Sequence, residues 1–148
     1  MEKYYFDTSV WLAYLNGSKE FYYKEARKWF DKIQNEQNLH TSMLVEKEIR
    51  NKYPDRMDFF HELLELLTEE NACYIIRISE KDKESAQRLL KSIPFRELDV
   101  REALSDALHI AVIKGKELSA VSADYKHWPY LCRFWGVHHH DISSIYTL

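Results

Sequence analysis

Apolar and polar positions along the chain follow two periods, one typical of buried strands and one typical of amphipathic helices. Short apolar runs predict five strands, over Tyr4–Phe6, Asn38–Ser42, Cys73–Ile78, Leu118–Ser122 and Trp135–His139. The segments between them predict a helix that begins at about Val10 and another that extends from a cap at Thr41 or Ser42 to Tyr53. Further helices are predicted over Lys19–Asn35, Asp55–Glu70, Ser79–Ser92 and Asp99–Gly115, and the chain ends in a short helix or turn. Strands separated by helices favour a parallel sheet covered on both faces. The expected fold class is α/β, a three-layer α/β/α sandwich with a short, mostly parallel central sheet.

Residues typical of helix caps mark several of the expected helix ends. Ser79 followed by Asp82 resembles a capping box, and Asp99 followed by Glu102 repeats the signal more cleanly. Gly115 suits the position just after a helix, where a left-handed backbone is common. These signals define where the two helices after the third strand begin and where the second of them ends.

Composition indicates one globular domain that spans residues 1–148. Of the 148 residues 45% are hydrophobic, and three glycines and three prolines leave little room for a linker. The N-terminal apolar stretch is broken by Asp7 and is too short to span a membrane, and Cys73 and Cys132 are expected to be core thiols. We therefore expect a soluble, cytoplasmic protein with no membrane segment.

The formal net charge of −3 argues against nucleic-acid binding through bulk positive charge. It is compatible with a metal-dependent site, because four of the 24 acids spent on divalent cations would leave 20 acids against 21 Lys and Arg. Charge alone therefore does not decide the substrate.

An acid follows the first strand directly. The order of strand, Asp7, two small hydroxyl residues and an apolar helical pattern predicts a carboxylate at the carboxyl end of a strand, where open parallel sheets place their ligands. The alternative is that Asp7 or Ser9 only caps the next helix. Asp124 repeats this pattern beyond the strand that ends at Ser122, and it too has the alternative of a helix cap.

A second kind of acid occupies the apolar side of a helix. At 100° per residue, Glu48 lies about 40° from Leu44, inside the apolar arc, whereas Glu46 lies about 200° away on the outer face. A carboxylate on an apolar face must be paired, protonated or bound to a metal. The alternative to a site role for Glu48 is an i,i+4 bridge to Lys52.

Asp106 lies at the edge of the apolar arc of its helix, so it could point across the rim of a cleft or into solvent. His109 follows one turn later and could line the same rim, although a hydrogen-bonded structural role is the favoured interpretation.

These residues together resemble the PIN-domain family, and most closely its small stand-alone ribonucleases of the VapC type. The matching stretches cover nearly the whole chain in the family's order: Phe6-Asp7-Thr8-Ser9-Val10, Ser42-Met43-Leu44-Val45-Glu46-Lys47-Glu48-Ile49, Ser105-Asp106-Ala107-Leu108-His109-Ile110-Ala111 and Ser122-Ala123-Asp124. The chain departs from the family where charged Glu46 and Lys47 replace apolar or small residues, and where Ser122 stands in place of a common threonine.

The resemblance implies a PIN-like fold and a metal-dependent endoribonuclease that hydrolyses RNA phosphodiester bonds to 5′-phosphate and 3′-hydroxyl ends. It implies an acidic catalytic and metal site of Asp7, Glu48, Asp106 and Asp124, in agreement with the choice of Glu48 from helical phase. Carboxylates without cysteine suit Mg²⁺ or Mn²⁺. It also implies that the protein is a toxin silenced by an antitoxin protein.

Substrate contacts are less well defined by the sequence. Ser9, Ser122 and Lys126 are the predicted substrate-binding residues, and further cations that could contact phosphate are Arg50, Lys52, Arg56, Lys81, Lys83, Arg88, Arg96 and Arg133. The aromatic residues of the first two helices, Trp11, Tyr14, Phe21, Tyr22, Tyr23 and Trp29, favour core packing, and part of them could form a homodimer or antitoxin surface.

Three alternatives stay open at this point. A PIN fold could bind RNA or protein as a catalytically inactive module. An aspartyl-phosphate phosphotransferase is disfavoured because Asp7-Thr8-Ser9 has neither a second Asp two residues on nor an acidic pair before it. The run His138 to His140 could bind a metal, but its place in the last expected strand favours a structural role.

Overall fold

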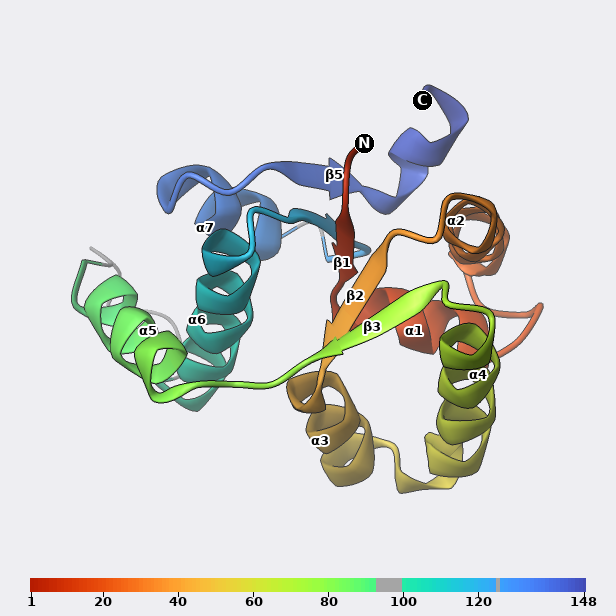
Figure 1. The fold of residues 1–148 in the computed structure, drawn as a ribbon, viewed down its shortest axis with the longest axis horizontal. Helices are drawn as coiled ribbons and strands as arrows, with labels where there is room; N and C mark the ends of the chain where they lie inside the picture. Colours follow the sequence, from red (N-terminus) through yellow and green to blue (C-terminus); the bar gives the residue numbers. More distant parts are fainter. Residues whose placement is uncertain (93–99, 125) are drawn as a thin grey trace.

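The computed structural model describes residues 1–92, 100–124 and 126–148, and its strands form one sheet (Figure 1). The strand order is β3-β2-β1-β4-β5, and every neighbouring pair is parallel. The bounds of the strands are β1 Tyr4–Phe6, β2 Leu39–Ser42, β3 Cys73–Ile76, β4 Ser119–Ser122 and β5 His139–Asp141. The predicted α/β class with a short parallel sheet is confirmed.

Helices cover both faces of this sheet. Their bounds are α1 Thr8–Leu15, α2 Tyr23–Glu36, α3 Met43–Lys52, α4 Met57–Glu69, α5 Glu80–Ser92, α6 Val100–Gly115 and α7 Trp128–Phe134, with 3₁₀ turns η1 Pro54–Arg56 and η2 Ile142–Tyr146. Figure 1 shows α1, α2 and α4 on one side of the strands and α5, α6 and α7 on the other. The three-layer arrangement is therefore confirmed. No helix in the described residues has the length and apolar character needed to cross a bilayer.

The predicted last strand over Trp135–His139 is wrong. Helix α7 continues to Phe134, and the chain then turns at Gly136, whose φ of 73° is in the left-handed region. Strand β5 begins only at His139. Trp135 and Val137 flank this turn and are buried there, not in a strand. Their apolar character therefore reflects core packing at the end of a helix.

Three helix starts are decided by local hydrogen bonds. Ser42 caps α3 by accepting from the Leu44 amide, and Ser79 and Asp82 form the predicted capping box, since each side chain accepts from the other's backbone N–H. Helix α2 begins at Tyr23 rather than Lys19, because the chain from Gly17 first makes two hydrogen-bonded turns. The signal at Asp99 and Glu102 lies outside the residues whose side chains the structure describes.

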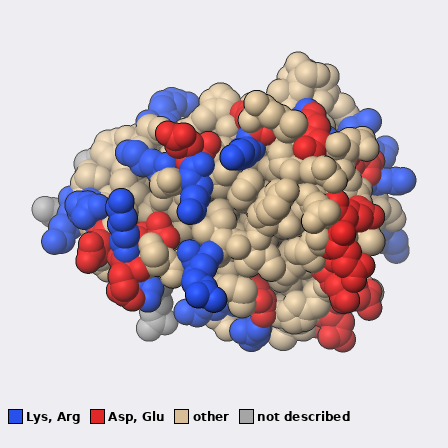
Figure 2. Space-filling view, viewed as in Figure 1, with Lys and Arg blue, Asp and Glu red and all other residues tan. Residues whose placement is uncertain are grey.

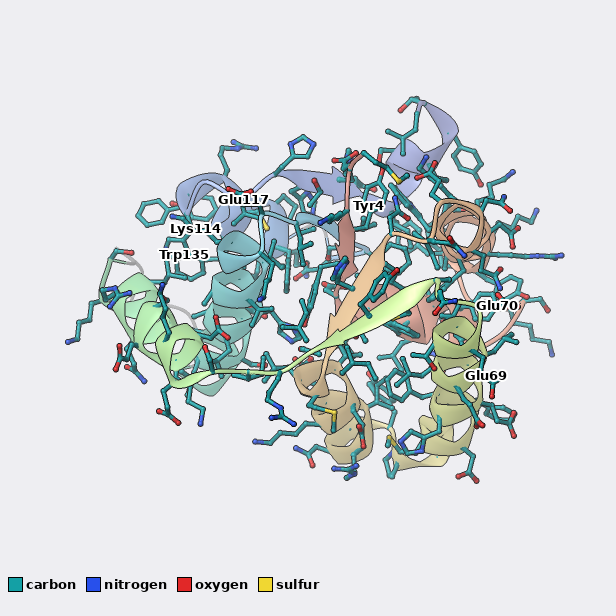
Figure 3. All side chains as sticks on the ribbon, viewed as in Figure 1. Tyr4, Glu69, Glu70, Lys114, Glu117 and Trp135 are labelled. Carbon is teal, nitrogen blue, oxygen red and sulfur yellow. The ribbon has the colours of Figure 1, made fainter. Side chains whose placement is uncertain are left out.

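Aromatic side chains fill the space between β1 and the helices α1, α2 and α4. The ring of Phe6 packs edge-on against Phe30 at 5.2 Å, and Trp11 packs edge-on against both Phe30 and Phe60 at 5.1 and 5.2 Å. Trp11 and Trp29 are fully buried, as favoured from the sequence, whereas Phe21 is 83% exposed. Both cysteines are buried free thiols. The dense array of side chains on this side of the sheet is visible in Figure 3.

The strand order also sets where a ligand site can form. From β1 the chain proceeds to β2 on one side, and it later returns to β4 on the other side of β1. The crossovers thus diverge between β1 and β4, and in open parallel sheets the crevice at the carboxyl ends of such strands is the usual ligand site. Asp7 follows β1 and Ser122 ends β4, so both lie at this crevice.

Candidate functional site

A cleft of about 220 Å³ lies at the carboxyl edge of the sheet. The four acids predicted from the sequence come to it from the end of β1, from α3, from α6 and from the segment after β4, and the cleft is lined by Asp7, Thr8, Ser9, Leu12, Glu48, Lys52, Tyr53, Asp106, His109, Asp124 and Trp128. The fold thus brings together side chains that are far apart in sequence. Their catalytic and metal-binding roles stay predictions.

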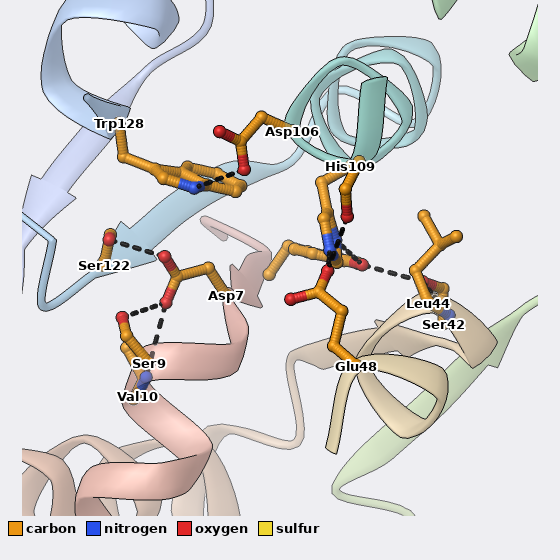
Figure 4. Close-up of polar contacts among 12 residues, drawn as sticks. Asp7, Ser9, Val10, Ser42, Leu44, Glu48, Asp106, His109, Ser122 and Trp128 are labelled. Carbon is orange, nitrogen blue, oxygen red and sulfur yellow. Dashed lines mark hydrogen bonds and ion pairs between the residues drawn. The ribbon is translucent and has the colours of Figure 1, made fainter. Parts of the chain in front are cut away.

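Asp7 is held by its neighbours on both sides of the β1/β4 crevice (Figure 4). Ser122 donates from its hydroxyl to Oδ2 at 2.6 Å, and the Ser9 hydroxyl and the Val10 amide donate to Oδ1. Burial raises the pKa of this carboxyl to about 6 despite these hydrogen bonds. Asp7 therefore caps α1, as the alternative interpretation proposed, and it also lines the cleft.

The predicted substrate-binding hydroxyls both have the same partner in the structure. Besides donating to Asp7, Ser9 accepts from the Ala123 amide at 3.0 Å, and Ser122 accepts from the Asp124 amide at 2.9 Å. Their observed contacts join the segment after β4 to the carboxylate after β1. Contact of these hydroxyls with a substrate stays a prediction.

Glu48 is paired with His109 and not with Lys52. The imidazole Nε2 contacts Glu48 Oε1, and the Ser105 hydroxyl donates to the same oxygen at 2.9 Å. Burial alone would raise the pKa of Glu48, but His109 and the Ser105 hydrogen bond outweigh it and lower the pKa to about 2. The helical phase correctly placed Glu48 on the inner face, whereas Glu46 contacts Arg50 and His61 away from the cleft.

His109 is the member of the site that sequence reasoning undervalued. It is 1% exposed, and its Nδ1 lies 2.7 Å from the Tyr5 hydroxyl, which in turn lies 2.7 Å from Ser42 Oγ. Burial lowers its pKa, but the hydrogen bond and charge of Glu48 outweigh burial and raise it. The predicted hydrogen-bonded structural role is what the contacts show, and those contacts also orient a cleft carboxylate.

Asp106 points into the cleft from α6 and accepts a hydrogen bond at 3.2 Å from the indole N–H of Trp128. Its pKa is raised to about 7, because burial and the charges of Glu48 and Asp7 outweigh the attraction of His109 and the indole hydrogen bond. A signal for Trp128 was present in the sequence as an aromatic residue close behind Asp124, but its pairing with Asp106 was not predictable there.

Asp124 lines the cleft, and its Oδ1 accepts from the backbone amides of Lys126 and His127 at 2.8 and 3.3 Å. Both amides precede α7, whose N-cap is His127 and which has no side-chain cap, so the alternative that Asp124 is a helix cap is wrong. Lys126 is exposed, and its predicted contact with substrate stays a prediction.

The charge balance of the cleft fits a cation. Three largely buried carboxylates, Asp7, Glu48 and Asp106, face one imidazole, and two of them have raised pKa values. An all-oxygen donor set suits a hard divalent cation. No three donor atoms of the cleft residues that the structure describes lie within 4.8 Å of one another. Among the described residues, three donor atoms come that close only at Glu2, His138 and His140.

Residues 4–129 match the model of the PIN domain, which covers most of the chain. The chain belongs to the PIN domain family. Members of this family are generally nucleases. No curated protein matches this PIN domain by sequence.

Solved structures agree with the family assignment at the level of the fold. A toxin–antitoxin complex from Klebsiella pneumoniae contains a chain 17% identical to this PIN domain, with a TM-score of 0.56 over 84% of this chain and 88% of that one. A DNA-bound VapBC structure from Salmonella typhimurium is 11% identical, with a TM-score of 0.62 over 96% and 99%.

Proposed function

We propose that this PIN domain is a metal-dependent endoribonuclease and the toxin of a toxin–antitoxin pair. The observation that supports this most strongly is the meeting of four acids from four separate elements in one cleft at the β1/β4 crevice. Burial of like charges in one cleft is unfavourable unless a cation or protons neutralise them, so the arrangement needs a functional explanation.

Asp7, Glu48, Asp106 and Asp124 would hold Mg²⁺ or Mn²⁺. When bound, such an ion lowers the pKa of a bound water and neutralises charge on the phosphodiester and the leaving oxygen. The protein's own contribution is orientation, since the Ser122 hydroxyl fixes Asp7, His109 fixes Glu48 and the Trp128 indole fixes Asp106.

A second feature supports a polyanionic substrate. A hollow of about 660 Å³ next to α5 and α6 contains five cations among its lining residues, namely Arg77, Lys81, Arg88, Lys114 and Lys116. Figure 2 shows many Lys and Arg side chains on the α5 and α6 side of this face, with some Asp and Glu side chains among them, and a run of Asp and Glu side chains on the opposite side. Phosphate contacts of RNA would favour the basic side despite the net charge of −3.

The antitoxin and homodimer partners also belong to this proposal. The similar solved structures are a toxin–antitoxin complex and a VapBC complex, which makes an antitoxin protein the expected partner. Large apolar side chains that are exposed, such as Phe21, Phe59 and Leu66, are available for a protein interface.

The decisive experiment compares Glu48→Gln with Glu46→Gln, two identical substitutions on α3. Each protein is first freed of metal with a chelator and then supplied with Mg²⁺ or Mn²⁺. RNA cleavage is measured on gels, and the ends of the products are analysed. Glu48→Gln should lower the rate about a hundredfold or more, since Glu48 faces the cleft, while Glu46→Gln should leave it nearly unchanged.

Products with 5′-phosphate and 3′-hydroxyl ends would agree with the proposal. If the folded wild-type protein cuts no RNA with either ion, or if Glu48→Gln is as active as wild type, the enzyme proposal fails. If the wild-type protein then binds RNA or a protein without cleaving RNA, the alternative of a catalytically inactive binding module is favoured.

A further inference from the structure

A cluster of side chains of the types that ligate metals lies outside the acidic cleft, at the amino ends of β1 and β5. The donor atoms of Glu2, His138 and His140 all lie within 4.8 Å of one another. Glu2 Oε2 is 2.8 Å from His140 Nε2 and 3.5 Å from His138 Nε2. For comparison, two ligands of one tetrahedral zinc ion at bond lengths near 2.1 Å lie about 3.4 Å apart.

Strand register explains why these residues meet. Tyr4 of β1 is level with Ser119 of β4, and the next position of β4, Ala120, is level with His139 of β5. His140 lies in β5, and His138 comes just before it, where its carbonyl accepts from the Ala120 amide. Because side chains alternate along an extended chain, both imidazoles point to the face of Tyr4 and Ser119. Glu2 precedes β1, and the Ser119 amide donates to the carbonyl of the next residue, Lys3, so backbone hydrogen bonds to β4 hold both outlying ligands at the sheet.

The ligands are also oriented by their neighbours. Ser119 donates from its hydroxyl to Glu2 Oε2 at 2.7 Å, and the Tyr4 hydroxyl donates to Oε1 at 2.9 Å. The His140 ring packs against Tyr4 and Trp29, with ring centroids 5.8 Å apart in each case. Figure 3 labels Tyr4 near the amino end of β1. Such supporting hydrogen bonds and packing fix the direction of metal ligands in known sites.

We propose that Glu2, His138 and His140 bind one divalent transition-metal ion, for which Zn²⁺ is the probe. Two imidazoles and one carboxylate form a donor set that borderline cations prefer, and it differs from the all-oxygen set of the cleft. His138 is 65% exposed at its side chain, so solvent can supply the remaining ligands. The ion joins the segment before β1 to β5, and it thereby stabilises the edge of the sheet opposite the cleft.

The test is a calorimetric titration with Zn²⁺ of the full chain, made without a polyhistidine tag, in the presence of excess Mg²⁺. We expect one Zn²⁺ per chain and a rise in melting temperature with zinc, because a ligand that binds the folded state stabilises it. His138→Ala removes one exposed ligand and should weaken binding about a hundredfold, whereas Ser119→Ala should weaken it roughly tenfold. His61→Ala, an exposed histidine on α4, is the matched control and should leave binding unchanged.

The variant Asp7→Asn, which alters only the acidic cleft, tests whether zinc binds at the proposed site or in the cleft. Zinc binding that persists in Asp7→Asn and is lost in His138→Ala would support the proposal, and an anomalous peak between residues 2 and 140 in a zinc-soaked crystal would place the ion. Zinc binding that is equal in wild type and His138→Ala, or that disappears in Asp7→Asn, would overturn it. Neither result depends on RNA cleavage, so the nuclease proposal is tested separately.

Discussion

Replacement of Asp7 by Asn should stabilise the metal-free protein while it abolishes RNA cleavage. Burial raises the folded-state pKa of Asp7 from 3.8 to about 6, so the folded protein binds this proton more tightly than the unfolded chain does. A group with a raised folded-state pKa makes stability fall as the pH increases from its unfolded value through its folded value. The charged carboxylate therefore destabilises the metal-free fold above about pH 6.

The magnitude follows from the size of the shift. A rise of about two pKa units corresponds to about 3 kcal/mol, because one unit is worth about 1.4 kcal/mol. An asparagine amide keeps an acceptor for only part of the hydrogen bonds from Ser9, Ser122 and Val10, so a gain of about 1 to 3 kcal/mol is expected. For a domain of this size that is a rise in melting temperature of roughly 3 to 10 °C.

The assay is urea denaturation of wild type and Asp7→Asn with a chelator present, at several pH values from 4 to 8. The difference in free energy of unfolding between the two proteins should be smallest near pH 4 and should grow to its full value above pH 6. Asp31→Asn, on the exposed face of α2, is the matched control and should show no such trend. If Asp7→Asn is the less stable protein at pH 8, or if the difference does not vary with pH, the inferred electrostatic strain is refuted.

Two further predictions concern the pairing of Glu48 and the basic hollow. His109→Ala should reduce the free energy of unfolding at pH 7 by about 3 to 5 kcal/mol, since it leaves a largely buried carboxylate without its imidazole partner; a loss below about 1 kcal/mol in urea denaturation would contradict this. Arg88→Ala and Lys114→Ala, each made in the inactive Asp7→Asn protein, should weaken RNA binding measured by fluorescence anisotropy. Each should also lower the magnitude of the slope of log affinity against log salt concentration by about 0.7. An unchanged slope would show that RNA does not contact the hollow.

Local patterns were sufficient for most of the secondary structure. Four of the five strands and the helices from α1 to α6 lie close to their expected positions, and the capping box at Ser79 and Asp82 forms as written in the sequence. The failures occurred where an apolar run has two explanations. Trp135 and Val137 are hydrophobic because they pack in the core after α7, and alternation alone cannot distinguish that from a strand.

The acids of the site could be chosen from the sequence because each breaks an apolar pattern, at a strand end for Asp7 and on a helix face for Glu48. Their partners could not be chosen in this way. His109 and Trp128 contact Glu48 and Asp106 only because α6 and α7 pack beside the sheet, and Ser122 contacts Asp7 because β4 pairs with β1.

The sequence by itself determined the class of fold and the residues that are chemically out of place, because propensity, periodicity and desolvation are local properties. Only the tertiary structure decided which charges face each other, since parallel register sets distances between residues that the chain separates by more than a hundred positions. Glu2 and His140 illustrate this: neither is conspicuous in sequence beyond the histidine run, yet the register of β1, β4 and β5 brings them to 2.8 Å.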